Sequence, residues 1–175
     1  MKKGFTVIEV SLVLAIAGLI FAMTFVALPA LQRSGRDTTR KDDMADFIAN
    51  VKKYQTNNRG ALPGSGDSGS LIEVKKYDNP MGADDTTWQG FYNKYLGENF
   101  YDPSGNVYSL NIKSCNSSTP GASCGENIEG NELGKILVLT QATCNGTDAV
   151  ASSNPRNLAV LYRTEGGGFV GCANT

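Results

Sequence analysis

With 175 residues, the chain has room for one ordinary domain, or for two only if both are small. Its 16 basic and 17 acidic side chains leave a net charge of −1, which argues against a polybasic nucleic-acid coat and an acidic solvating tail. Histidine is absent, and this excludes Ser-His-Asp and Cys-His nucleophile systems as well as histidine-ligated zinc or haem. An enzyme that uses carboxylates or cysteine alone stays open on composition, but we expect no enzymatic activity and no cofactor.

The N-terminal segment is apolar over a length that can cross a lipid bilayer. Between Lys3 and Arg33 the only charged side chain is Glu9, and the window from Gly4 to Gln32 exceeds the roughly 20 residues that a spanning helix needs. Because lysines precede this window, the positive-inside rule keeps the N-terminus in the cytoplasm and places the chain after Arg33 outside. A secretory signal peptide would have a shorter apolar region of about 7–15 residues, whereas a plain membrane anchor stays open on hydropathy alone.

Glu9 distinguishes this segment from a plain anchor. A carboxylate in the hydrocarbon region costs roughly 2.5–3.5 kcal/mol even on lenient insertion scales, so such a residue normally marks a function and has a partner. The basic leader, Gly4, Phe5-Thr6, Glu9 and the following apolar stretch together resemble the class III signal of type IV pilins and type II secretion pseudopilins. The motif is highly specific, because leader, glycine, phenylalanine and glutamate must all keep register.

The resemblance implies a processing site and a division of the chain. A membrane-embedded aspartic prepilin peptidase would cut on the cytoplasmic side between Gly4 and Phe5, and the new amine of Phe5 would be methylated. Residues 1–4 are then a leader peptide, residues 5–32 a transmembrane and filament-core helix, and residues 33–175 an extracellular head.

The same resemblance implies a partner for Glu9 and two weak points in the helix. We expect the mature amine of Phe5 in one subunit to pair with Glu9 of a neighbour, which turns a costly charge into a device that sets the stagger between subunits. Gly18 stands where the family commonly has glycine, but the usual kink-forming proline is replaced by Val26, and a proline follows only at Pro29. We expect the segment from Gly18 to Pro29 to extend or lose helical bonds on packing in a filament.

The helical pattern continues as an amphipathic helix over residues 33–57. We expect one helix from about Thr6 to Thr56, with a break near Pro29 or Gly35 left open. Aspartates are interleaved with its basic residues, which favours a solvated face or an inter-subunit salt-bridge zone over a DNA-binding stripe. The apolar stripe is Met44, Phe47, Ile48, Val51 and Tyr54, and the basic residues are Arg33, Arg36, Arg40, Lys41, Lys52 and Lys53.

A loop region over residues 58–106 follows. Aromatic residues are concentrated between Tyr77 and Tyr101, and core packing is a better interpretation of them than a carbohydrate-binding platform. A short helix from Trp88 to Leu96 is predicted within this region. The sequence Asp-Pro-Ser-Gly-Asn at 102–106 predicts a turn, and a similar turn precedes the first strand of several pilins and major pseudopilins.

Residues 107–175 are predicted to form an antiparallel sheet. Strands are expected at 107–112, 135–143, 157–164 and 168–172, from their alternating or apolar character and the turn residues between them. Three or four antiparallel strands against the long helix give an α+β head of two layers.

Four cysteines fall in the predicted external region, where an even number indicates two disulfides. Three connectivities are open. We favour Cys115–Cys124, which closes a short Ser/Gly/Pro-rich loop, with Cys144–Cys172, which ties a strand end to the C-terminal tail as in many pilins. Each bond is expected to contribute about 2–4 kcal/mol. No Cys-x-x-Cys pair supports a four-thiolate zinc site, and a solvated loop is a better interpretation of acidic residues 125–132 than a calcium site, so no metal is expected.

We interpret the chain as a type IV pilin precursor, a structural subunit of a surface filament that serves adhesion, twitching motility or DNA uptake. The resemblance implies a helical homopolymer, with the prepilin peptidase, a pilus assembly platform, its ATPase and, before assembly, the cytoplasmic membrane as partners. No specific nucleic acid is expected. Two alternatives stay open: a major pseudopilin of a type II secretion system, and a membrane-anchored extracellular binding module that never assembles.

Overall fold

The structure is a computed structural model with two compact units, Met1–Gly35 and Arg36–Thr175. Expectations for Tyr77 and for most of the acidic loop 125–132 lie outside the described residues. The structure describes residues 4–64, 72–74, 86–96, 100–115, 117, 119–125, 128, 133–165 and 170–175.

Helix α1 (Val7–Asn57) begins and ends within one residue of the predicted helix. It passes Gly18, Pro29 and Gly35 without interruption, so the break that the sequence left open is absent. Proline removes a single N–H donor, and the alanine and leucine residues around Pro29 have high helix propensity, which keeps the backbone helical on both sides. A loss of helical bonds between Gly18 and Pro29 in a filament stays a prediction.

The second unit holds a five-stranded sheet and a two-stranded sheet. The strands are β1 (Ile72–Val74), β2 (Ser109–Ser114), β3 (Lys135–Thr140), β4 (Ala142–Asn145), β5 (Asp148–Ala151), β6 (Leu158–Arg163) and β7 (Val170–Asn174). The large sheet has the order β1-β2-β3-β6-β7, and β4 pairs with β5. The predicted fold class, a long helix with a sheet-containing head, is confirmed. The large sheet is mixed rather than antiparallel throughout, because β2 and β3 run parallel and are joined by a connection longer than the dozen or so residues that a crossover needs.

Local geometry explains where the strands depart from the prediction. The strand predicted at 135–143 is divided at Gln141, whose backbone φ of 58° turns the chain between β3 and β4. The strand predicted at 107–112 starts later, because Val107 instead forms an isolated bridge with Tyr101. The sequence did not predict β1 and β5, which have three and four residues and are too short for a clear alternation.

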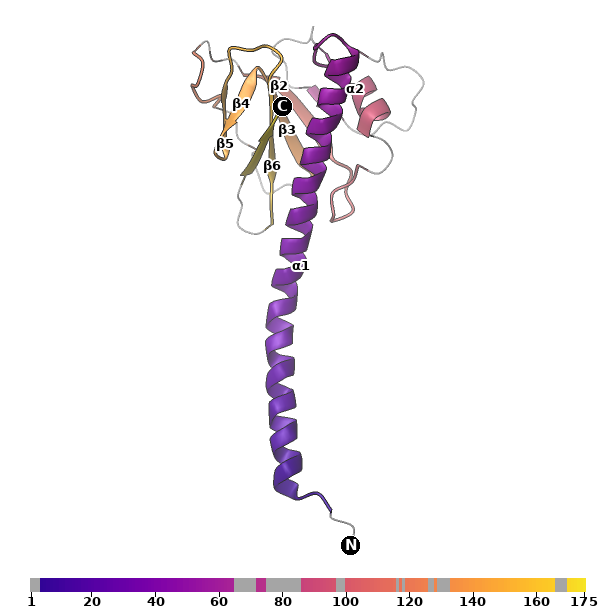
Figure 1. The fold of residues 1–175 in the computed structure, drawn as a ribbon, viewed down its shortest axis with the longest axis vertical. Helices are drawn as coiled ribbons and strands as arrows, with labels where there is room; N and C mark the ends of the chain where they lie inside the picture. Colours follow the sequence, from indigo (N-terminus) through magenta and orange to yellow (C-terminus); the bar gives the residue numbers. More distant parts are fainter. Residues whose placement is uncertain are drawn as a thin grey trace. The chain divides into compact units, whose positions relative to one another are not determined.

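Both faces of the large sheet are covered. The C-terminal part of α1 packs across one face, as Figure 1 shows, and the predicted apolar stripe of α1 is buried there. The β4–β5 sheet covers the other face and adds a layer that the sequence did not predict. β3 and β6 are therefore buried on both sides, which explains why their sequences are continuously apolar rather than alternating. The residues facing α1 are Ile136, Val138, Leu158 and Val160, and those facing β4–β5 are Leu137, Leu139, Ala159 and Leu161.

Both favoured disulfides are present; Cys115 is buried in the core between the two sheets, and the other three cysteines are partly buried against it. Cys144 on β4 is bonded to Cys172 on β7, so the small sheet is tied to the edge strand of the large one. Cys115, directly after β2, is bonded to Cys124, whose N–H donates to the carbonyl of Ala149 on β5 at 3.0 Å. The two bonds thus fasten the β4–β5 layer to β7 and to the end of β2.

The predicted helix from Trp88 to Leu96 is present as α2 (Trp88–Phe91) followed by the π-helix η1 (Tyr92–Leu96). Its aromatic rings pack against the apolar stripe of α1. For example, Phe47 and Phe91 pack edge to face, with their ring centroids 5.9 Å apart. Trp88, Phe91 and Tyr92 are at most 2% exposed. Core packing of these aromatic residues is therefore confirmed.

Candidate functional site

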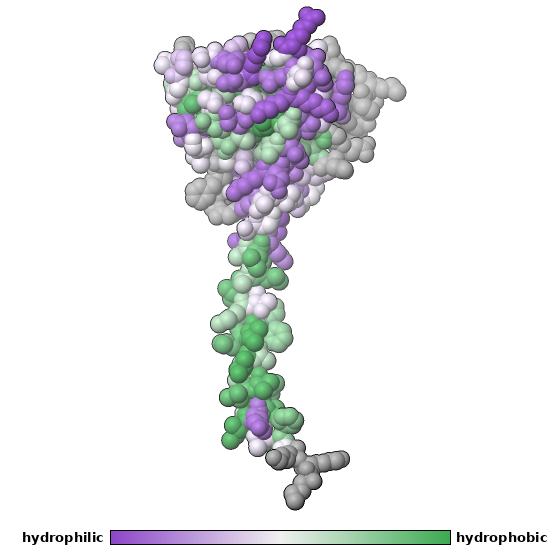
Figure 2. Space-filling view, in the orientation of Figure 1, coloured by the Kyte–Doolittle hydropathy of each residue, from purple (hydrophilic) through white to green (hydrophobic). Residues whose placement is uncertain are grey.

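The apolar N-terminal segment, residues 5–31, leaves its large side chains exposed. These side chains are 49–89% exposed, and Figure 2 shows apolar residues over most of the visible face of this segment. The helix that contains them is long and apolar enough to cross a membrane. A continuous apolar surface of this extent is unfavourable in water, so it requires lipid or protein around it.

Thr6 and Glu9 form a capping box at the start of α1. The Thr6 N–H and the Thr6 hydroxyl each donate a hydrogen bond of 2.8 Å to Glu9 Oε2, and the Glu9 N–H donates to Thr6 Oγ1 at 3.3 Å. These bonds satisfy N–H groups that have no partner within the helix. Sequence reasoning treated Glu9 only as an assembly residue and missed this role, although the Thr-x-x-Glu spacing before an apolar run signals it.

Only one carboxylate oxygen of Glu9 takes part in the capping box. The Thr6 N–H and the Thr6 hydroxyl both donate to Oε2, and no group among the described residues donates to Oε1. The carboxylate is therefore able to cap its own helix through Oε2 while Oε1 accepts a hydrogen bond from a cation outside the chain.

The predicted cleavage bond lies in non-helical chain. The helix α1 begins only after Gly4, Phe5 and Thr6. Phe5 is 89% exposed, so the bond between Gly4 and Phe5, which precedes the capping box, is accessible. Gly18 is also open: no described side chain or distant backbone atom comes within 4 Å of the position that a Cβ would take. Contacts within the single chain therefore give no reason for glycine at this position.

A group of charged side chains, the ion cluster, ties α1 to two turns of the head and consists of Arg36, Asp37, Arg40, Asp102 and Glu165. Arg40 is 1% exposed, and its Nε and Nη2 donate to the two carboxylate oxygens of Asp102 at 2.6 and 3.0 Å. Arg40 also donates to Asp37 at 2.9 Å and to Glu165 at 2.8 Å. Arg36 makes two bonds to the same Glu165, at 2.8 and 2.5 Å. The expectation of a solvated or inter-subunit face is wrong for Arg40, because the fold brings two distant carboxylates to it within one chain.

The arginines of the ion cluster lower the pKa of Asp102 and Glu165. The hydrogen bonds from Arg36 and Arg40 outweigh partial burial and lower the pKa of Glu165 from 4.5 to about 2. Burial raises the pKa of Asp102, but the hydrogen bonds from Arg40 and Ser104 together outweigh it and leave the pKa below its ordinary value. Both carboxylates are therefore ionised at neutral pH.

We expect the head to lose stability in acid, between about pH 4.5 and about pH 2. The unfolded chain protonates Glu165 near pH 4.5 and the folded chain only near pH 2, so this carboxylate stabilises the fold fully above that interval and progressively less within it. Thermal unfolding of the full-length chain in detergent micelles, repeated across this interval, measures the loss. Burial raises the pKa of Asp43 despite a hydrogen bond from Tyr108, so Asp43 acts in the opposite sense and does not account for it.

The Glu165→Gln variant is the control for this acid transition. It lacks the titrating group, so its unfolding midpoint should be lower than that of the wild type near neutral pH and should fall less steeply in acid. Parallel curves for the two proteins would contradict a role for Glu165 in acid sensitivity.

Comparison of the chain with protein-family models, curated proteins and solved structures gives no match. The function therefore rests on the chemistry of the apolar N-terminal segment and of the head that follows it.

Proposed function

We propose that the chain is the precursor of a type IV pilin, a structural subunit that polymerises through its N-terminal helix into a surface filament for adhesion, twitching motility or DNA uptake. The observation that carries the proposal is an exposed apolar helix with a single carboxylate, Glu9, at its start, directly after a Gly4–Phe5 junction. Lipid covers this helix before assembly, and neighbouring copies cover it in the filament.

Processing prepares the subunit for assembly. The prepilin peptidase cuts between Gly4 and Phe5 at the cytoplasmic face, and the new amine of Phe5 is methylated. Before assembly the chain spans the cytoplasmic membrane, with its N-terminus in the cytoplasm and its head outside the cell membrane. An assembly platform driven by a cytoplasmic ATPase then transfers the helix from lipid into the filament core.

The capping box supports the pairing of Glu9 with a neighbouring subunit. Oε2 of Glu9 is occupied by Thr6, whereas Oε1 is open among the described residues. Cleavage creates a cationic amine on Phe5, and in a filament the amine of a neighbour can donate to Oε1. An unpaired carboxylate in an apolar medium costs roughly 2.5–3.5 kcal/mol, so the stagger that pairs every amine with a carboxylate is favoured over all others.

Two observations bear on the alternatives. A major pseudopilin would share every N-terminal feature, but the two disulfides favour a pilin, because major pseudopilins usually lack them. A membrane-anchored binding module that never assembles would offer Glu9 Oε1 no cationic partner among the residues that the structure describes. Microscopy of filaments sheared from the cell surface separates the pilus from both alternatives.

We expect the mature chain from its native host to begin at Phe5 and to carry a methylated amine. Intact-mass measurement and sequencing of the N-terminal peptide by mass spectrometry test this. A Gly4→Leu variant is the control, since a bulky side chain at the cleavage bond should block the peptidase and leave the chain starting at Met1. A wild-type chain that retains Met1 or Lys2 would contradict processing and would remove the partner proposed for Glu9.

A further inference from the structure

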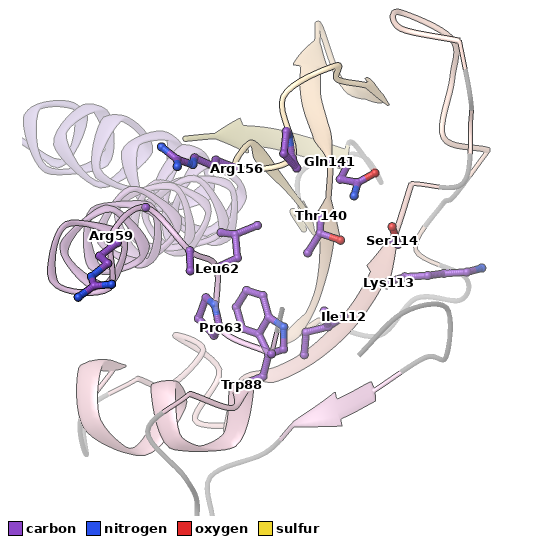
Figure 3. Close-up of a pocket in the computed structure, with 14 residues that line it drawn as sticks. Arg59, Leu62, Pro63, Trp88, Ile112, Lys113, Ser114, Thr140, Gln141 and Arg156 are labelled. Atoms are coloured by element: carbon purple, nitrogen blue, oxygen red, sulfur yellow. The ribbon is translucent and has the colours of Figure 1, made fainter. Parts of the chain in front are cut away.

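A pocket of about 350 Å³ lies in the head, between the end of α1 and the ends of β2 and β3 (Figure 3). It shares no residue with the apolar N-terminal segment or the ion cluster, so the proposed filament function does not account for it. Its volume is at the lower end of the roughly 300–1,000 Å³ that is typical of ligand sites, which suits a small ligand.

The described lining of the pocket includes basic side chains and no acidic ones. Arg59 and Arg156 are exposed and lie on the α1 side, whereas Lys113 points outward in Figure 3. Neither Arg59 nor Arg156 forms an ion pair with any of the described residues, in contrast to Arg36 and Arg40. Two guanidinium groups on the α1 side that have no counter-charge among the residues the structure describes create a field that favours an anion.

The floor and the opposite wall add two further chemical features. Leu62 and Trp88 close the floor with apolar side chains and are only 7% and 2% exposed. Ser114, Thr140 and Gln141 come from the sheet side and offer neutral hydrogen-bonding groups. An apolar floor suits the C–H face of a sugar ring, and hydroxyl and amide groups suit its hydroxyls.

Two residues that line the pocket have an unfavourable backbone conformation. Arg59 and Gln141, with φ of 55° and 58°, are the non-glycine residues of positive φ in the described part of the chain, and both line the pocket. This conformation costs an L-residue about 1–2 kcal/mol, and the position after a helix is one where glycine is common. Such strain gathers at ligand sites.

Arg156 is held against the end of α1, close to the residue that follows Arg59. Its guanidinium lies so close to Gly60 that a Cβ there would meet Nη1 at 2.9 Å, and its carbonyl accepts a hydrogen bond from the Gln55 amide at 2.8 Å. We propose that this pocket binds an anionic sugar, with the ring on the apolar floor, the hydroxyls on the sheet side and the carboxylate or phosphate at Arg59 and Arg156.

Trp88 provides the measurement, because it is the chain's only tryptophan and forms part of the floor. The full-length chain in detergent micelles at low salt is titrated with D-galacturonate, D-galactose 6-phosphate, D-galactose and inorganic phosphate, and Trp88 fluorescence is followed. We expect saturation by at least one anionic sugar at a concentration roughly tenfold below that for neutral galactose, since a hydrogen bond to a charged group contributes about 1.5–3 kcal/mol. The two anionic sugars distinguish a carboxylate from a phosphate ligand. The absence of a saturable change, equal response to neutral galactose, or equally tight binding of inorganic phosphate would each overturn the proposal.

Arg156→Gln and Arg59→Gln test the two cations separately. Each should weaken binding of the anionic sugar by roughly tenfold and leave the response to neutral galactose unchanged. Lys53→Gln is the matched control, because Lys53 is an exposed cation of α1 outside the pocket lining, and it should change the affinity by less than about twofold. Circular dichroism and the thermal midpoint verify that each variant is folded. Unchanged affinity in a folded arginine variant would overturn the role of that arginine, and unchanged affinity in both would overturn the proposal.

Discussion

Replacing Glu9 with alanine or glutamine is expected to abolish filament formation while cleavage between Gly4 and Phe5 continues. In an assembled filament either change would leave the amine of Phe5 buried without its carboxylate, and an uncompensated buried charge costs about 3–5 kcal/mol per subunit. The subunit concentration needed for growth should therefore rise by about 100-fold or more. Immunoblotting and electron microscopy of filaments sheared from the native host measure the effect.

The structure supplies controls that separate the charge of Glu9 from its role in the helix cap. Thr6→Ala removes the hydroxyl of the capping box at a cost of about 1 kcal/mol but keeps the carboxylate, so filaments should persist. Glu9→Gln keeps a side chain that can complete a capping box but removes the charge. Filaments of wild-type abundance from the Glu9→Gln variant would contradict the pairing with Phe5 and would leave the cap as the only function of Glu9.

Arg40→Met is expected to destabilise the head by about 3–5 kcal/mol. Arg40 is buried, and the side chain of Asp102 is fully shielded from solvent, so the substitution leaves a buried carboxylate without its bidentate partner. Glu165 would also lose one of its two arginine partners. Urea unfolding of the full-length chain in detergent micelles, followed by the fluorescence of Trp88, measures the change.

Arg36→Met is the matched control for Arg40, because both arginines bind Glu165. The side chain of Arg36 is 36% exposed, and exposed ion pairs contribute about 0–1 kcal/mol, so this variant should remain close to the wild type. Combining Arg40→Met with Asp102→Asn should cost less than the sum of the two single changes, because residues in one buried network are coupled. Equal destabilisation by Arg36→Met and Arg40→Met would contradict the importance of burial in the ion cluster.

Features that depend on neighbouring residues could be predicted from the sequence. The helix bounds follow from a 3.6-residue periodicity and from the stop signal Asn57-Asn58-Arg59-Gly60, and the buried stripe from Met44 to Tyr54 is confirmed. The Cys115–Cys124 pairing joins cysteines only nine residues apart, and the favoured Cys144–Cys172 bond follows the layout of the pilin head. The Thr6–Glu9 capping box is equally local and could have been predicted from the sequence, because the chain contains its four-residue signature, Thr-x-x-Glu.

Features that depend on the path of the chain through the sheet were decided only by the tertiary structure. Arg40 meets Asp102 and Glu165 across 62 and 125 residues, and no local pattern links these side chains or shows that Arg40 is buried. The parallel pairing of β2 with β3 depends on a crossover, and the strand sequences are compatible with either direction.

The sequence by itself thus determined the apolar helix, its lone carboxylate, the cysteine content and the overall α+β class, because these are properties of local spacing and composition. The tertiary structure decided the mixed sheet, the added β4–β5 layer, the ion cluster and the pocket. Each of these joins residues from distant parts of the chain, and it is the burial of apolar surface on both faces of β3 and β6 that brings them together.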